Sequence, residues 1–152
     1  MKNYLVCFLG FLLLVSCKTL DNKSSTDLTN DKAKIISINF NTTGGGDIQF
    51  KISPTNSEYK INIIRYRYTS ASVEISISEN TNTELHGLLS KIFSKEIDIR
   101  DEVYKPEDPT GTWTTVTVNY DTQEAVKITN VVVNNKLSVL YDYIENESKS
   151  IN

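Results

Sequence analysis

The chain has 152 residues, with 16 lysines and arginines against 19 aspartates and glutamates, which gives a formal net charge of -3 at pH 7. This length allows one domain with its own core. The acidic residues are in slight excess and are spread along the chain, and the basic residues form no stripe. We therefore expect no nucleic-acid partner. A single histidine and two cysteines supply too few ligands for a typical zinc site.

The first 16 residues have the parts of an export signal: a lysine at position 2, an apolar run from Tyr4 and a small-residue approach to a cut. The run is too short for a bilayer, which needs about 20 apolar residues. It ends in Leu14-Val15-Ser16-Cys17, which resembles the lipobox of bacterial lipoproteins. Two alternatives remain open, an ordinary secretory signal and a short N-terminal membrane anchor.

The lipobox resemblance implies cleavage between Ser16 and Cys17, removal of residues 1–16 as a signal peptide, and acyl chains of the palmitate type on Cys17. The membrane would then be the first partner of the protein, through the lipid on Cys17. Lys18, rather than aspartate, follows the cysteine. By the sorting rule of enteric bacteria, this favours the outer membrane of a Gram-negative bacterium.

Residues 17–32 are polar and show no apolar periodicity, so we expect the lipidated cysteine and a flexible tether there. A single globular domain is predicted over 33–148, followed by a disordered tail at 149–152. The domain opens with alternating apolar and polar residues over 36–40 and 48–52, which is the period of a strand. Gly44, Gly45 and Gly46 supply the turn between the two strands.

Alternation continues over 59–68 and 73–77, which predicts a second hairpin. The period then becomes helical. Thr81 and Glu84 have the spacing of a capping box, and an apolar stripe follows at Leu85, Leu88, Leu89 and Ile92. A connector over 94–111 carries mixed charges.

Strands are predicted again over 112–120 and 125–131. Asn134 or Asn135 is placed to cap a last helix, whose stripe is Leu137, Leu140, Tyr141 and Ile144. The predicted order is ββββαββα, with two tandem hairpin–helix units. We therefore expect an α+β fold, an antiparallel sheet with both helices packed on one face. The other face would stay open to solvent or a partner.

Arg65 and Arg67 alternate with two tyrosines at the end of a long strand, so both arginines share a face. Two guanidinium groups on one face are suited to an anion or an acidic partner. Trp113 has the parity opposite to the apolar positions of its own strand and is a candidate aromatic anchor. We predict that Arg65, Arg67 and Trp113 form part of a partner-binding surface. An exposed strand end and a tryptophan packed under the connector are the structural alternatives.

We predict no catalytic residues, metal or cofactor. His86 falls outside the stripe of its helix and is expected to be a surface side chain, and no Gly-x-Ser-x-Gly elbow accompanies it. Six carboxylates lie in the connector, where a solvated loop is favoured over a calcium site. These acids are Glu96, Asp98, Asp101, Glu102, Glu107 and Asp108.

A glycine-rich first hairpin followed by two hairpin–helix units is similar in topology to emfourin-like inhibitors of thermolysin-type metalloproteases. The resemblance covers about residues 35–148 and implies a protein-binding inhibitor. Gly46 and Asp47 stand where that family has a glycine and an aromatic residue, so no functional residue is carried over.

The sequence thus predicts a non-catalytic, lipid-anchored binding module of the cell envelope. An envelope or secreted protein, bound in an inhibitor-like or immunity-like manner, is the leading partner. A carrier of a glycan or small ligand is the alternative, and an envelope hydrolase is the third.

Overall fold

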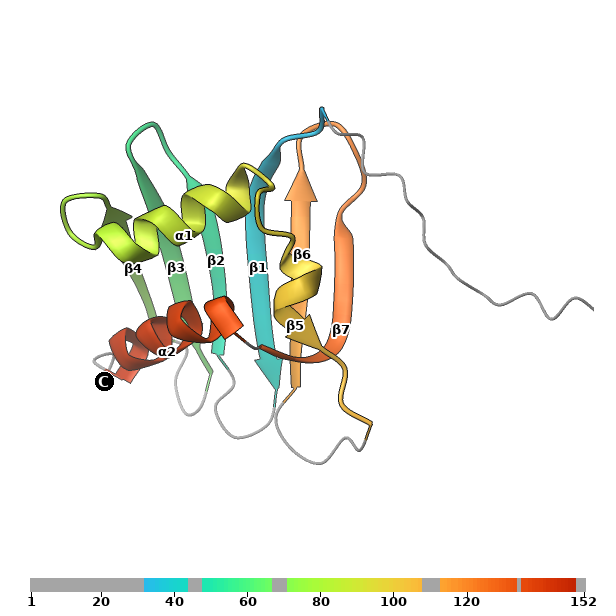
Figure 1. Cartoon of the computed structure of the whole chain (residues 1–152). Helices are drawn as coiled ribbons and strands as arrows, with labels where there is room; N and C mark the ends of the chain where they lie inside the picture. Colours follow the sequence, from blue (N-terminus) through green and yellow to red (C-terminus); the bar gives the residue numbers. More distant parts are fainter. Residues whose placement is uncertain (1–31, 44–47, 67–70, 108–112, 134, 150–152) are drawn as a thin grey trace, which may run out of the picture.

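An antiparallel sheet of seven strands forms the body of the domain in the computed structural model, which describes residues 32–43, 48–66, 71–107, 113–133 and 135–149 (Figure 1). The strands are β1 (Ile35–Thr43), β2 (Ile48–Pro54), β3 (Glu58–Arg65), β4 (Ala71–Ser78), β5 (Val103–Tyr104), β6 (Trp113–Tyr120) and β7 (Val126–Val133). The helices are α1 (Thr83–Phe93), the short 3₁₀ turn η1 (Ile99–Glu102) and α2 (Asn135–Lys149). The predicted α+β class with an antiparallel sheet is confirmed.

The strands lie in the order β4-β3-β2-β1-β6-β7-β5. The hairpin of β6 and β7 therefore adds to the free edge of β1, which becomes a central strand. Phe40 of β1 is registered with Phe50 of β2 on one side and with Val116 of β6 on the other. The predicted order lacks β5 and η1, which both lie in the connector. A strand of two residues, paired with Val132 and Val133 of β7, is too short to show alternation.

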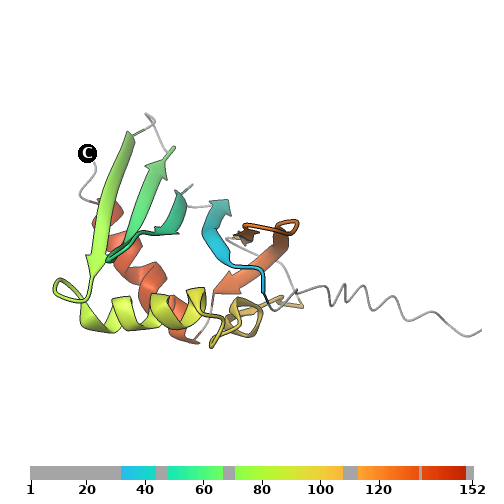
Figure 2. The same ribbon diagram turned by 90° about the horizontal axis from the view of Figure 1, so that it is seen from above.

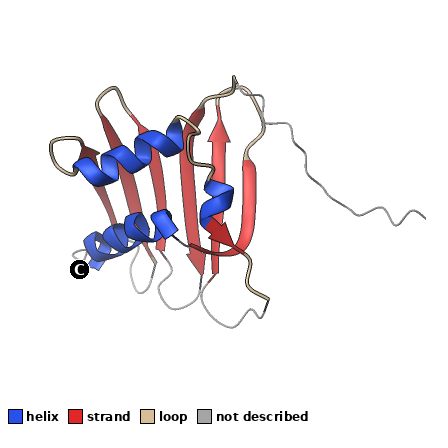
Figure 3. Ribbon diagram, viewed as in Figure 1, coloured by secondary structure: helices blue, strands red, loops and turns tan. Residues whose placement is uncertain are grey.

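Both helices lie in front of the sheet in Figure 1 and on one side of it in the perpendicular view of Figure 2. Figure 3 shows the same arrangement by element type, with the strands behind the two long helices. Apolar side chains of the helices and the facing side of the sheet form one core. Its buried residues on the helices are Leu85, Leu89, Ile92, Leu137, Leu140 and Ile144, and those on the central strands include Ile38, Phe40, Phe50, Ile52, Ile61, Ile63 and Val116.

A small polar cluster ties α2 to one end of β1 and the adjoining start of β6. The Thr42 hydroxyl lies 2.7 Å from the Tyr141 hydroxyl and 3.1 Å from the Thr114 hydroxyl. The hydrogen bonds satisfy groups that would otherwise be costly to bury. Burial raises the pKa of Tyr141 above its ordinary value, so its phenol stays protonated and able to donate at neutral pH.

The start of α1 differs by one residue from the capping-box prediction. Asn82 is the N-cap, and its side-chain oxygen accepts a hydrogen bond from the Leu85 backbone N–H at 3.1 Å. Thr81 instead belongs to the preceding turn, where its hydroxyl accepts from the Ser78 N–H at 2.9 Å. Asn and Thr are both good caps, and the geometry of the turn after β4 selects the asparagine.

The start of α2 is held by a residue far away in the sequence. The Glu102 carboxylate, buried at the end of η1, accepts a hydrogen bond from the Lys136 backbone N–H at 3.0 Å. A carboxylate at this position satisfies a free helix N–H and favours the positive end of the helix dipole. Asn134, one of the two predicted caps, lies outside the described residues, and Asn135 is the first residue of α2.

We therefore expect Glu102→Ala to lower the free energy of unfolding by about 1–2 kcal/mol, which is the usual cost of losing a helix cap. Asp101→Ala, at the exposed neighbouring acid, should cost less than about 0.5 kcal/mol. Urea unfolding followed by circular dichroism measures both. Equal losses of unfolding free energy in the two variants would show that the Glu102 carboxylate does not stabilise α2 as a cap.

Candidate functional site

The face of the sheet opposite the helices carries two rows of mainly polar side chains, which we call the open face. Strand registers align one row across six strands, as Glu74, Asn62, Lys51, Asn39, Thr117 and Lys127. The second row is Ser72, Ile64, Gln49, Asn41 and Thr115. These residues alternate with the buried core positions, because successive side chains of a strand point to opposite faces. Neither α1 nor α2 lies on this side (Figure 2).

The open face is hollowed over its central strands. A depression of about 480 Å³ lies there. Its polar lining consists of Asn39, Asn41, Gln49, Lys51, Asn62, Thr115, Thr117 and Lys127. With strands about 4.8 Å apart, the row from β4 to β7 extends over roughly 24 Å. The surface is therefore wide enough for several contacts with one partner.

Asn39 lies at the centre of the depression, between Lys51 and Thr117 in register. Its side-chain oxygen is buried and has no hydrogen-bond partner among the described residues. A buried acceptor without a donor costs about 1–3 kcal/mol. A hydroxyl or amide group of a bound molecule is the kind of donor that this oxygen lacks, so Asn39 is a candidate for contact with a polar ligand.

The two rows that define the open face contain two lysines and one glutamate, although the chain as a whole is acidic. The Lys60 ammonium lies 2.9 Å from the Glu74 carboxylate, and this hydrogen bond, with the charge of Glu74, raises the pKa of Lys60. The pair is neutral in sum. Lys51 and Lys127 are both exposed on the same row and give this face its excess charge, which favours an acidic partner.

Aromatic side chains lie at one end of the open face. Trp113 is half-buried and paired with Thr43 at the edge. Its parity matches Thr115 and Thr117, so it faces away from the core, as the sequence predicted. Tyr66 is 45% exposed, and its hydroxyl donates to the Gln49 amide oxygen at 3.1 Å. Both rings are available as flat contact surfaces.

Arg65 lies on the other face of the sheet. It follows the parity of Ile61 and Ile63, which are buried in the core, and it is registered with the buried Ile48. Its Nε is buried without a partner among the described residues. Strand parity therefore places Arg65 and Trp113 on opposite faces of the sheet. Arg67 lies outside the described residues, and the partner-binding role of all three stays a prediction.

His86 is half-buried rather than freely exposed, and its ring lies 5.3 Å from that of Tyr59. The acids of the connector have separate roles. Asp98 pairs with Arg100, Glu96 accepts from the Ser94 hydroxyl at 3.1 Å, and Glu102 caps α2. Within the described ranges, no three side chains gather as metal ligands, and Asp108 lies outside those ranges. We therefore propose no cation site here.

Ser16 and Cys17 lie outside the described residues, so cleavage and lipidation stay predictions from the lipobox. In the described part of the chain, none of the helices has the length and apolar character needed to cross a bilayer. No protein-family model, curated protein or solved structure matches this chain.

Sequence reasoning missed the residues that define the open face. The alternation of Asn39 with buried neighbours indicates that it points away from the core. It does not indicate that Thr117 and Lys127 lie beside it, because that depends on β6 pairing with β1. The strand order, which the sequence pattern leaves undefined, brings the two lysines onto one row.

Proposed function

We propose that this protein is a non-catalytic, lipid-anchored binding module of the cell envelope. In this proposal, the lipid on Cys17 attaches the chain to the membrane, and residues 17–32 form the tether. In the same proposal, the helices of the two hairpin–helix units cover one face of the sheet, and the open face is the one that meets a partner. The observation that carries the proposal is the uninterrupted row of polar side chains from β4 to β7.

An envelope or secreted protein with an acidic surface is the leading partner. Lys51 and Lys127 present positive charge on both sides of Asn39, and charge of this kind steers association and selects the partner. Trp113 and Tyr66 add flat aromatic area at one end, which is the type of side chain that carries binding energy in protein interfaces.

A glycan is the second candidate, favoured by the amide and hydroxyl lining of the depression. Sugars offer hydroxyl groups that both donate and accept hydrogen bonds. The Asn39 oxygen, which finds no donor in the described part of the chain, could accept from one of them. The aromatic rings of Trp113 and Tyr66 are suited to packing against the apolar face of a sugar ring.

The test captures partners on the full-length chain held in lipid nanodiscs. Envelope and secreted fractions of the source bacterium are applied, and bound protein and bound carbohydrate are quantified separately. Lys51→Glu with Lys127→Glu reverses the charge of the open face. Lys91→Glu with Lys136→Glu changes two exposed lysines on the helix side by the same charge.

We expect the open-face variant to capture less partner than wild type, by a factor of about ten or more. The reason is that losing charge complementarity weakens the free energy of binding by about 1.4 kcal/mol or more. The helix-side variant should retain wild-type amounts. A protein that binds wild type supports the leading candidate, and carbohydrate supports the second. Equal capture by both variants would remove the open face as the binding surface.

A further inference from the structure

Strand β4 forms one edge of the sheet, and its outer side carries no further strand (Figure 1). The strand is registered with β3 along its whole length and without a break, from Ala71 opposite Arg65 to Ser78 opposite Glu58. None of its residues has a positive φ, and none is a proline. An edge strand of this length, with neither a bulge nor a proline, is a template for pairing with another strand.

A hydrogen-bonded turn at the end of β4 shows which of its backbone groups point outward. The N–H and C=O groups of successive residues in a strand point alternately to its two sides. The Ser78 N–H donates to the Thr81 hydroxyl at 2.9 Å, and the Ser78 carbonyl accepts from the Thr81 N–H at 3.2 Å. Ser78 therefore points away from β3, and the same alternation directs the backbone groups of Ser72, Glu74 and Ser76 outward.

The far side of β3 agrees with this assignment. The Thr55 N–H donates to the Glu58 carbonyl at 2.8 Å, so Glu58 turns its backbone groups toward the end of β2. Because Glu58 is registered with Ser78, neither residue bonds to the other across the β3–β4 ladder. Among the described residues, the outward N–H and C=O groups of Ser72, Glu74 and Ser76 have no hydrogen-bond partner. The edge thus presents a row of free donors and acceptors.

The side chains of β4 define what a further strand must look like. Val73 and Ile75 point to the helix side, where they are partly buried and pack against the core. Ser72, Glu74 and Ser76 are exposed on the side of the open face. A strand that pairs with this edge must therefore present apolar side chains to the helix side and polar ones to the other. β4 itself has this pattern.

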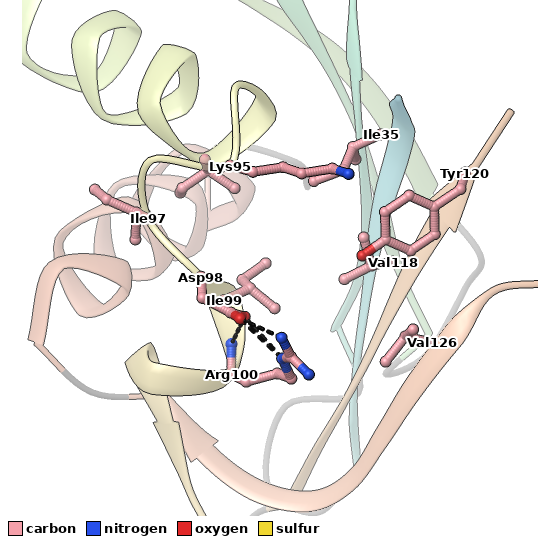
Figure 4. A pocket seen from close by; sticks show the side chains of 10 residues that line it. Ile35, Lys95, Ile97, Asp98, Ile99, Arg100, Val118, Tyr120 and Val126 are labelled. Carbon is pink, nitrogen blue, oxygen red and sulfur yellow. Dashed lines mark hydrogen bonds and ion pairs between the residues drawn. The ribbon is translucent and has the colours of Figure 1, made fainter. Parts of the chain in front are cut away.

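The opposite edge of the sheet is less suited to such pairing. The register of β7 shifts between Ile128 and Val131, where Asn130 has φ of 58°, and a bulge of this kind bends an edge strand. The end of β7 is paired with β5. The connector packs beside β7 on the helix side, where Arg100 and Val126 line one cavity (Figure 4). Of the two edges in the described sheet, only that of β4 is long and regular.

We propose that the β4 edges of two copies of this chain pair antiparallel, so that their sheets join into one. A two-fold axis at Ile75 places Glu74 opposite Ser76 of the second copy. The outward groups of these residues then form two pairs, each of which exchanges two main-chain hydrogen bonds. Ile75 lies opposite its own counterpart, and each isoleucine covers the other on the helix side. Such an interface is closed, so it yields a dimer and no longer assembly.

The position of the axis follows from charge and from the turn. An axis at Glu74 would set two glutamates opposite each other, and like charges in that arrangement destabilise a sheet. With the axis at Ile75, each Glu74 faces a serine and keeps its ion pair with Lys60 at 2.9 Å. Ser78 uses its backbone groups in the turn, so the pairing ends before it. This short interface predicts a weak dimer, and it depends on neither the open face nor the lipid anchor.

Sedimentation equilibrium of the full-length chain in density-matched detergent micelles tests the dimer. We expect a monomer–dimer equilibrium that shifts toward the dimer as protein concentration rises. Ser76→Pro removes an N–H that points outward and leaves the ladder with β3 intact, because proline is tolerated at such a position of an edge strand. It should weaken dimerisation by about tenfold or more, since each dimer loses two hydrogen bonds. Ser76→Ala keeps the N–H and should dimerise as wild type does.

Disulfide trapping tests the register. Ile75→Cys sets two thiols opposite each other in a pair whose Cα atoms lie about 4.5 Å apart, which is within the range of a disulfide. Val73→Cys lies on the same side of the strand, but its two copies are roughly 14 Å apart along the paired strands. We expect a covalent dimer from Ile75→Cys and none from Val73→Cys. Wild type, which has Cys7 and Cys17, gives the background.

The proposal is overturned if wild type stays monomeric throughout the millimolar range. It is equally overturned if a folded Ser76→Pro variant dimerises as tightly as wild type, or if Val73→Cys is trapped as readily as Ile75→Cys. Should circular dichroism show that Ser76→Pro is unfolded, the two cysteine variants decide. A monomer whose Glu74 and Ser76 amides are protected from hydrogen exchange only in envelope extract would show that another protein supplies the strand, against this proposal.

Discussion

Leu89→Ala is expected to lower the free energy of unfolding by about 2–5 kcal/mol, which is the range for a large core side chain cut to alanine. Leu89 is fully buried, with 0% exposure, at the middle of the face that α1 turns toward the sheet. The variant loses the apolar transfer energy of the side chain and leaves a cavity that the surrounding strands can fill only in part. For a domain of this size, the melting temperature should fall by roughly 10 °C or more.

The matched comparison uses the same helix. Leu88 is only partly buried, so Leu88→Ala should cost clearly less than Leu89→Ala. His86→Ala removes one ring of the pair with Tyr59. It should lower the free energy of unfolding by no more than about 1.5 kcal/mol. Differential scanning calorimetry gives the three values. A His86 variant as unstable as the Leu89 variant would contradict the orientation of α1.

Cys17→Ser is expected to leave the chain unacylated and uncut after Ser16. Cys17 comes directly after Leu14-Val15-Ser16, and the resemblance of this run to a lipobox predicts that its thiol receives the lipid. Two or more acyl chains anchor a protein stably, whereas a single chain gives an association constant of only about 10⁴ M⁻¹. The wild-type mature chain should therefore fractionate with the membrane.

Mass spectrometry of the wild-type membrane fraction measures this directly. The expected N-terminal peptide begins at Cys17 and carries the added mass of acyl chains. Cys7→Ser is the matched control, because that cysteine lies within the predicted signal and its loss should change neither cleavage nor acylation. An unmodified Cys17 in the wild-type protein would refute the lipid anchor.

The sequence pattern predicts the long elements because each has a clear period. Ile48, Phe50 and Ile52 alternate with polar residues and form β2, and Leu85, Leu89 and Ile92 form the buried face of α1. The contacts of the connector could not be predicted in this way. In the sequence, Glu102 is one of six similar acids, and only the fold brings the first turn of α2 beside it, a contact between residues 34 positions apart.

The candidate sites depend more strongly on tertiary structure than the elements do. Arg65 belongs to the helix side because Ile61 and Ile63 take the core positions of β3, while the sequence left the facing of this strand ambiguous, with apolar residues on both parities.

Site-specific photocrosslinking in living cells tests the binding function of the open face most directly, because it captures a partner whose identity is unknown. A benzophenone amino acid replaces Asn62 or Lys127 on the open face, or Lys91 or Asn146 on the exposed sides of the helices. We predict covalent adducts from the two open-face positions and none from the two helix positions, with a discrete band for a protein and a broad smear for a glycan. Adducts confined to the helix positions, or no adduct from either open-face position, would contradict the proposed binding surface.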